Sequence, residues 1–324
     1  MLKKVGLKEI FMVSLIIFLF IIPFMGLSDY LITVFILAYI FAIVAASWDI
    51  INGWSGVFNF AQIAFFAVGA YASGTLSKYL NVSPVLTIWV GGLFAVLAAV
   101  GIGIPTLRLR GAYIALLTFA YHSFIQSILV SPSLTKYTGG AYGIVVPDLA
   151  IGNWEFNLTA YYIITLSILI IAALSLFAIV KSPIGIAFQA SRDSFDYSLS
   201  RGISDIKYRI YAFIVGSFFT GVAGALYGHY NGFVDTTVFG FEFTWKTLAM
   251  LTVGGLGTLT GPIVSSILIT FLLEWLRFLG PWRFFILGVL LWGVVVFTRR
   301  GLQQLIDLFF RTLDNIEKRI LGDR

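Results

Sequence analysis

The side chains of this chain that could do chemistry are a few ionisable groups inside long apolar segments. Five qualify by position: Asp49, His122, Glu242, Lys246 and Glu274. An ionisable group in a membrane is costly unless it is paired or hydrated, so each is a candidate for function. Glu242 and Lys246 are four residues apart, which predicts an ion pair on one helix face. We favour this structural pairing over a role at the external mouth of a pathway.

No catalytic constellation accompanies these residues. The sequence has no G-x-x-x-x-G-K-[ST] phosphate loop, so we do not expect it to hydrolyse ATP in the manner of P-loop proteins. With no cysteine and two distant histidines, it also lacks the ligand patterns of thiolate and H-E-x-x-H zinc sites. We expect a protein that is not an enzyme and binds no cofactor or metal, with any energy source supplied from elsewhere.

Composition gives the setting of the ionisable groups, because 59% of residues are hydrophobic, 11% are charged and long apolar runs recur throughout. We predict an all-α, polytopic transmembrane protein with one membrane domain. It should have about ten spans, some of them short or broken by glycine. The predicted spans are 10–27, 31–51, 57–77, 84–104, 111–130, 159–180, 209–228, 244–258, 262–279 and 282–298.

The distribution of basic residues predicts the orientation. With the N-terminus in the cytoplasm, most of the 21 Lys and Arg residues fall on the cytoplasmic side. Those left outside are Lys78, Lys136, Lys246, Arg277 and Arg283. The same rule explains the net charge of +6 without a nucleic-acid partner. Both termini should be cytoplasmic, and the first span should be a retained helix rather than a signal peptide because its apolar run is too long.

Two glycine clusters interrupt spans, one at 52–56 and one at 254–261. Backbone freed from helical bonding at membrane depth must be buried in protein or line a cavity, so both clusters are candidates for a pathway. For a single glycine, close helix packing is the better interpretation. Asp49, just before the first cluster, is expected to bond freed backbone groups. The similar positions of the clusters in the two halves suggest a possible inverted repeat.

Residues 181–209 form the one long polar segment between apolar spans, and this segment contains the start and stop signals of two helices. Ser182 can cap a helix whose first turn accepts Pro183, and Gly202 is a natural stop. Ser204 then caps the helix that re-enters the membrane. One face of the first helix is apolar, through Ile184, Ala187, Phe188, Phe195 and Leu199, and the other carries Arg192, Asp193, Asp196 and Arg201. Periodicity alone is equally typical of an amphipathic helix lying on lipid headgroups.

Several runs resemble the branched-chain amino acid ABC transporter permeases, in particular the LivM-type subunit. They are SWDIINGWSGVFNFAQIAFFAVGAY at 47–71, RLRGAYIALLTFA at 108–120, TGGAYGI at 138–144 and GGLGTLTGPIVSSIL at 254–268. The longest is a run at 182–234, which begins SPIGIAFQASRDSFDYSLSRGISDIKYR. They occur in the family's order and cover most of residues 47–300. The first 45 residues and the tail after Arg300 resemble the family only in their general character and not in specific motifs.

The resemblance implies a permease subunit of an ATP-driven importer in the cell membrane. Its implied partners are a second, LivH-like permease, two cytoplasmic ATPases that use ATP and Mg, and an external binding protein that delivers the amino acid. The segment 181–209 would dock on an ATPase through Ser182, Pro183, Gly185, Arg192, Asp193, Arg201 and Gly202. Candidate residues of the translocation path are Asp49, Asn52, Gly53, Gly56, Gly139, Gly140, Glu242, Gly254 and Gly257.

The chain departs from the family in its middle helix. Related permeases usually carry an acidic and then a basic residue three positions later, where this chain has Ser123 and Gln126, with His122 beside them. A urea or short-amide permease of the same family is therefore the alternative. A different class, an ion-coupled secondary transporter using Asp49, Glu242 and Lys246, also stays open, as does a membrane scaffold without transport activity.

The resemblance divides the chain into a transmembrane permease domain, 1–300, and a cytoplasmic amphipathic tail, 301–324. Apolar residues recur near helical spacing in this tail, and basic residues flank them. This pattern is typical of an interfacial helix in contact with membrane lipids. We favour lipid contact over contact with a partner.

Overall fold

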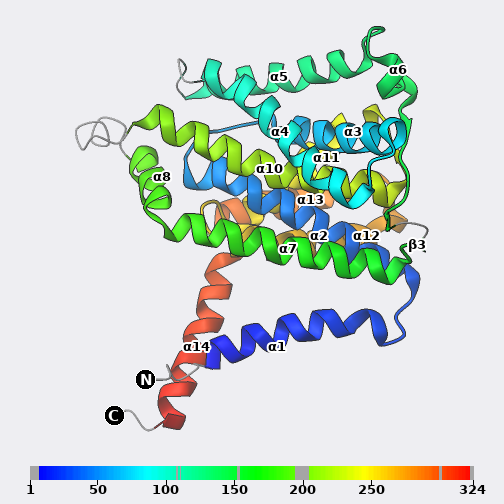
Figure 1. Ribbon diagram of the computed structural model, residues 1–324. Helices are drawn as coiled ribbons and strands as arrows, with labels where there is room; N and C mark the ends of the chain where they lie inside the picture. The colour runs from blue at the N-terminus through cyan, green and yellow to red at the C-terminus, as the bar shows by residue number, and fades with distance from the viewer. Residues whose placement is uncertain are drawn as a thin grey trace.

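A computed structural model describes residues 7–106, 109, 111–151, 154–193, 204–298 and 301–321 of the chain. Long helices run side by side along one axis, as Figure 1 shows, and connect at the two ends of the bundle. The α-helices are α1 (Leu7–Ile21), α2 (Asp29–Asp49), α3 (Gln62–Leu80), α4 (Pro84–Thr106), α5 (Ala112–Val130), α6 (Thr135–Thr138), α7 (Leu158–Lys181), α8 (Pro183–Asp193), α10 (Asp205–Asn231), α11 (Phe241–Gly254), α12 (Thr260–Trp275), α13 (Trp282–Phe297) and α14 (Gln303–Leu321).

Short elements connect these helices. A π-helix, η2 (Ile50–Trp54), continues α2, and 3-10 turns lie at η1 (Ile22–Phe24), η3 (Gly140–Tyr142), η4 (Thr236–Phe239) and η5 (Leu276–Leu279). Two antiparallel ladders of two-residue strands lie at the end of the bundle where α7 begins. They pair β1 (Ile144–Val145) with β4 (Phe233–Val234) and β2 (Ala150–Ile151) with β3 (Trp154–Glu155).

The protein is an all-helical membrane protein, as predicted. Each predicted span contains most of one helix, but only six helices are long and apolar enough to cross a membrane, among the described residues. They are Asp29–Trp54, Pro84–Thr106, Ala112–Val130, Leu158–Lys181, Ile206–Asn231 and Thr260–Leu279, and two shorter apolar helices are Ile10–Phe24 and Trp282–Val294. The predicted count of ten spans is therefore not confirmed.

Helix α2 is the centre of the bundle. Almost every side chain from Ala38 to Asp49 is buried, and the helix packs against α7, α10, α11 and α12. A helix that is apolar all round is expected in such a place. The hydroxyl of Tyr39 lies 2.8 Å from that of Tyr162 on α7, so these two buried phenol groups satisfy each other. Helix α1, by contrast, is largely exposed and lies at the edge of the bundle.

Small residues bring α3, α4 and α10 together. A Cβ on Gly69 would overlap the backbone of Gly221, and one on Gly224 would overlap the backbone of Phe66. These overlaps are what close packing of membrane helices through small residues produces. The sequence-based prediction that most single glycines serve helix packing is confirmed at these positions.

Helices α2 and α12 run antiparallel. Near one end of the pair, the hydroxyl of Tyr30 donates to the carboxylate of Glu274 at a distance of 2.5 Å. Near the other end, the carboxylate of Asp49 accepts a hydrogen bond from the N–H of Leu259. The two glycine clusters thus meet at one end of the bundle. A repeat inverted across the membrane would place corresponding breaks at opposite depths, so these two clusters cannot be its counterparts, and the predicted inverted repeat is not confirmed.

Candidate functional site

The carboxylate of Asp49 joins the two glycine clusters. It accepts hydrogen bonds from the backbone N–H of Gly257 at 2.6 Å and of Thr258 and Leu259 at 3.0 Å each. Asp49 is fully buried, and bonds of this kind, with an ionised acceptor, are among the stronger ones in proteins. The expectation that Asp49 bonds freed backbone is confirmed. The donors, however, lie in the second glycine cluster, at 254–261, and not in the cluster at 52–56 that follows Asp49 in the sequence. We call the contact between 49–56 and 254–261 the glycine junction.

Close backbone approach explains why glycines form this junction. A Cβ on Gly53 would overlap the backbone nitrogen of Gly257, and a Cβ on Gly254 would overlap the backbone of Gly261 and Pro262. A side chain at Gly53 would move one segment away from the other, and a side chain at Gly254 would open the turn of the second cluster. The junction is therefore held at backbone contact distance.

The turn of the second cluster contains strained backbone. Leu259 has a φ of 56°, in the left-handed region that side chains other than glycine rarely adopt, and Gly257 has a φ of 76°. Such a conformation persists only where its surroundings hold it. Here the Asp49 carboxylate binds the N–H of Leu259 itself. The strain and the carboxylate are thus parts of one local structure.

The first cluster leads into a segment without regular secondary structure, 55–61, so α3 begins at Gln62 and not at the predicted 57. Side chains bind the backbone that has no helical partner. The Asn52 side chain accepts from the N–H of Asn59 at 3.0 Å, Asn59 accepts from the N–H of Ala61 at 2.9 Å, and Thr118 accepts from the N–H of Phe60 at 3.0 Å. Non-helical backbone inside a membrane requires such partners.

Arg192, near the end of α8, reaches the glycine junction. Its Nη1 donates to the carbonyl oxygen of Gly53 at 2.8 Å, and a Cβ on Gly56 would lie 2.5 Å from its Cγ. Its Nε pairs with Asp193 at 3.0 Å. The positive φ of 69° at Gly56 and the absence of a side chain there leave the space that Arg192 fills. The predicted coupling helix therefore directly contacts Gly53 and Gly56, two of the candidate residues of the translocation path.

The corner between α7 and α8 has the helix-start residues that the sequence predicted. Ser182 accepts the N–H of Ile184 at 3.2 Å, with Pro183 at the first helical position. A Cβ on Gly185 would overlap the carbonyl group of Val180, so glycine permits the tight corner. Ser204 caps α10 as predicted, accepting the N–H of Lys207 at 3.4 Å. Arg201, Gly202 and the other predicted residues of 194–203 lie outside the described residues.

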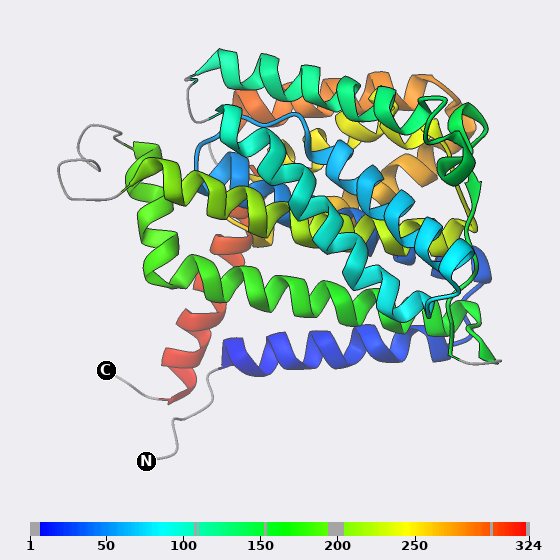
Figure 2. The same ribbon diagram turned by 45° about the horizontal axis from the view of Figure 1, so that its top comes forward.

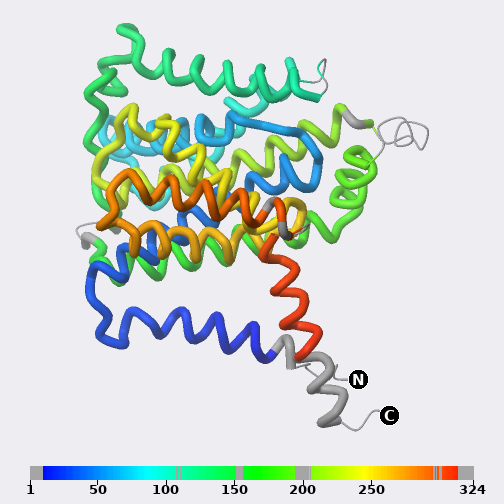
Figure 3. The backbone as a smooth tube through the Cα atoms, turned by 180° about the vertical axis from the view of Figure 1, so that it is seen from behind, coloured from blue at the N-terminus to red at the C-terminus, as the bar shows by residue number. Residues whose placement is uncertain are grey.

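Helix α14 is attached to the same junction by contacts that the sequence did not indicate. The N–H of Leu302 donates to the carbonyl oxygen of Val253 at 2.8 Å, and the Thr260 hydroxyl donates to Gln303 at 2.6 Å. Figure 3 shows α14 leaving the bundle at this end. A polar pocket of about 400 Å³ lies between α8, the junction and α14, lined by Trp54, Arg192, Leu256, Gly257, Thr258, Gln303 and Asp307.

The other candidate residues of the path lie at the opposite end of the bundle. Gly139 and Gly140 form the turn before β1, and Glu242 lies in the first turn of α11. The predicted path residues therefore form two groups and not one site. Gly257 lines the polar pocket beside α8, whereas Glu242 lines a separate, apolar groove between α11 and α13.

The predicted ion pair between Glu242 and Lys246 is wrong. Glu242 pairs instead with Arg283 of α13, at 3.5 Å, and the ammonium of Lys246 lies 4.0 Å from the centre of the Phe41 ring. The helical spacing does place both residues along one groove, but a cation from another helix is the closer partner. Glu274 is bound by Tyr30 and Arg277, and His122 Nε2 lies 3.1 Å from the carbonyl oxygen of Phe239.

The structure thus joins a bundle of apolar helices to the corner helix α8 through a core that glycines interrupt. The model of one protein family, described as "Branched-chain amino acid transport system / permease component", matches residues 30–297. This chain belongs to that family. The resemblance stated from the sequence and the permease function that it implies are confirmed.

Individual relatives agree with this assignment. The chain is 26% identical to the high-affinity branched-chain amino acid transport system permease protein LivM of Escherichia coli over 320 residues, which cover 91% of this chain and 75% of the relative. It is 21% identical to LivH of the same organism over 244 residues, 71% of this chain and 79% of the relative. It is 26% identical to the probable branched-chain amino acid transport permease protein LivH of Methanocaldococcus jannaschii over 220 residues, which cover 65% of this chain and 69% of the relative. No solved structure matches the chain.

Proposed function

We propose that this chain is one of two permease subunits of an ATP-driven importer of branched-chain amino acids. The observation that carries the proposal is the hydrogen bond from Arg192 on α8 to the carbonyl oxygen of Gly53. Through it, a displacement of the α8 helix would reach the junction where two membrane helices are broken. Transport needs such a mechanical link because the energy source is expected outside this chain.

The partners follow from the family. Relatives of this chain include both LivM and LivH, each named as a permease protein, which supports pairing with a second, similar permease. Two cytoplasmic ATPases would use ATP and Mg and grip α8, including the exposed Asp193. An external binding protein would deliver the amino acid. This chain would supply the membrane path and no catalytic group.

The proposed topology embeds all ten predicted spans, from α1 to α13, in the cell membrane. The N-terminus, α8 and α14 would face the cytoplasm, and the β-ladders at the opposite end of the bundle would face outward. Residues 1–300 would form the permease domain and 301–324 the tail on the cytoplasmic leaflet. Basic residues concentrate toward the α8 end, in accord with the positive-inside rule.

The substrate path is proposed to pass along the exposed face of α5. In Figure 2 this helix lies at the margin of the bundle. It exposes Ser123 and Ser127 among apolar residues, and the Ser127 hydroxyl donates to the carbonyl oxygen of Ser123 at 2.9 Å. Hydroxyls on an exposed face at membrane depth suit a wet path between two permeases better than lipid.

The ion-coupled secondary transporter is a weaker candidate. Its predicted coupling site includes Asp49, but both carboxylate oxygens of Asp49 already accept backbone N–H bonds. A coupling carboxylate must exchange a proton or a sodium ion during each cycle, and here that exchange would release the turn at Leu259. The residue is better suited to holding the junction.

Reconstitution tests the proposal. The chain is placed in liposomes with its candidate permease, ATPase and binding-protein partners, and uptake of labelled leucine is measured with and without ATP. We expect uptake that requires ATP and all partners. Uptake by this chain alone, driven by a proton or sodium gradient, would contradict the proposal. Competition by valine, isoleucine and urea for the binding protein would define the cargo.

A further inference from the structure

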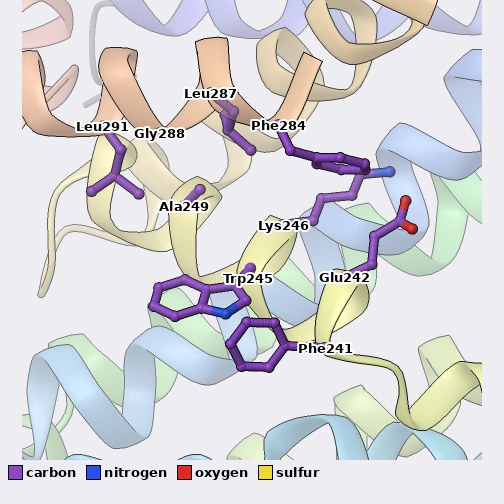
Figure 4. A pocket seen from close by; sticks show the side chains of 9 residues that line it. All are labelled: Phe241, Glu242, Trp245, Lys246, Ala249, Phe284, Leu287, Gly288 and Leu291. Atoms are coloured by element: carbon purple, nitrogen blue, oxygen red, sulfur yellow. The ribbon is translucent and has the colours of Figure 1, made fainter. Parts of the chain in front are cut away.

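A groove lies between α11 and α13 at the end of the bundle away from α8. Its volume is about 410 Å³, and its walls are almost entirely apolar (Figure 4). Ala249 forms part of the α11 wall, and Leu287 and Gly288 form part of the α13 wall. Lys246 and Glu242 are the only charged residues that line it among the described residues.

Lys246 is the unusual member of this groove. Its side chain is partly buried, and its ammonium lies over the face of Phe41, 4.0 Å from the ring centre. Within the described part of the chain, no hydrogen bond and no carboxylate within 4.0 Å satisfies it. An ammonium at such a depth is costly without an anion. Glu242 and Glu274 are close enough to interact with this ammonium electrostatically, but neither forms a contact ion pair with it. The groove therefore presents a positive charge that can still pair directly with an anion.

Glu242 lies one helical turn before Lys246 and is the more exposed of the two. One carboxylate oxygen lies 3.5 Å from Arg283, which leaves the carboxylate able to accept from another donor. One end of an apolar groove thus carries an anion and a cation a turn apart. This is the complement of a zwitterion with an apolar side chain.

We propose that this groove binds a small apolar α-amino acid on its way into the path. Its carboxylate pairs with Lys246, its ammonium pairs with Glu242, and its side chain packs on Ala249, Leu287 and Gly288. The proposal rests on the proposed function and adds a substrate contact to it. A lipid chain is the other candidate occupant, but a short groove that has both charges at one end suits the amino acid better.

Two glycines of α13 supply a matched pair of variants. A Cβ at Gly288 or at Gly293 would meet no atom within 4 Å, so a side chain fits at either position without disturbing the backbone packing. Only Gly288 lines the groove. G288L fills the proposed site, and G293L adds the same side chain to the same helix outside it.

The experiment measures binding of labelled L-leucine to the purified full chain in lipid nanodiscs, without ATP or partners. We expect G288L and K246M each to weaken binding by about ten-fold or more, with G293L near wild type and K246R retaining most of the affinity. Isovalerate, which lacks the ammonium, and isopentylamine, which lacks the carboxylate, should compete poorly. Thermal unfolding of each variant establishes that it is folded.

The proposal is overturned if leucine does not bind, as a lipid-filled groove would produce, or if G288L and G293L bind leucine equally. It is also overturned if isovalerate competes as well as leucine. Failure of the proposed function looks different. In that case the reconstituted complex shows no ATP-driven uptake, whereas leucine binding by the isolated chain and its loss in G288L are unaffected.

Discussion

The Nη1 of Arg192 donates a 2.8 Å hydrogen bond to the carbonyl oxygen of Gly53, a residue 139 positions earlier in the chain. The bond connects the corner helix α8 to the break in the central helix α2. Asp49, one turn before Gly53, binds the turn that starts α12. A movement of α8 can thus reach α2 and α12 through two adjacent contacts, which is the transmission that an ATP-driven permease requires.

The Asp49 carboxylate is predicted to hold the junction together. In D49N, one oxygen acceptor becomes an amide donor that faces backbone N–H groups, so bonds are lost and a repulsive contact appears. We expect a destabilisation of about 3 kcal/mol and loss of most uptake. Thermal unfolding and leucine uptake measure the two effects. D29N, at the exposed other end of α2, serves as the control, and equal behaviour of the two variants would contradict this role.

Gly53 is predicted to tolerate no side chain. The added methyl group in G53A would overlap the backbone of Gly257 and separate the two clusters. We expect a cost of about 1–3 kcal/mol and strongly reduced uptake. The control is G103A in α4, where the nearest atom to a Cβ, in Phe213, is 4.0 Å away. Wild-type uptake by G53A would show that the clusters need not touch.

The sequence predicted the helices well because apolar length and helix caps are local signals. Ser182 and Pro183 indicated the start of α8, and Ser204 indicated the start of α10, as the structure has them. The non-helical segment 55–61 was missed, because its bonds come from side chains such as Thr118, 58 residues from its partner Phe60. Periodicity contains no information about such partners.

The site was predictable in its members and not in its arrangement. Glycine clusters and Asp49 stood out as interruptions of apolar spans, but the partner of Asp49 lies 208 residues away. Glu242 was assigned to Lys246 because only helical spacing was available, whereas Arg283 arrives from a different helix. The attachment of Gln303 to Thr260 had no sequence signal at all.

The α7–α8 corner is predicted to set the position of α8. In G185A the new methyl group would overlap the Val180 carbonyl group and tilt α8 away from α7. We expect weaker association with the ATPase subunit, by about ten-fold, and a smaller effect on folding of the membrane helices. Co-purification of the ATPase with each variant measures this, with G103A again as control. Undiminished co-purification would mean that the corner is not needed for docking.

The contact of Arg192 with Gly53 is predicted to serve transmission. R192Q should lose the charged hydrogen bond to the junction but leave the rest of α8 intact. The control is K207Q, which also removes a positive charge, since the Lys207 side chain is exposed near the start of α10 and its ammonium lies 5.7 Å from the centre of the Tyr211 ring. The earlier hypothesis, that Arg192 docks the ATPase, predicts instead that the two subunits separate in such a variant.

The most direct measurement is the amount of leucine taken up per ATP hydrolysed in proteoliposomes that contain the complete complex. For R192Q we predict a ratio lower than that of wild type by about ten-fold, with ATP hydrolysis and ATPase association retained, and for K207Q a ratio near wild type. A wild-type ratio in R192Q would contradict the account.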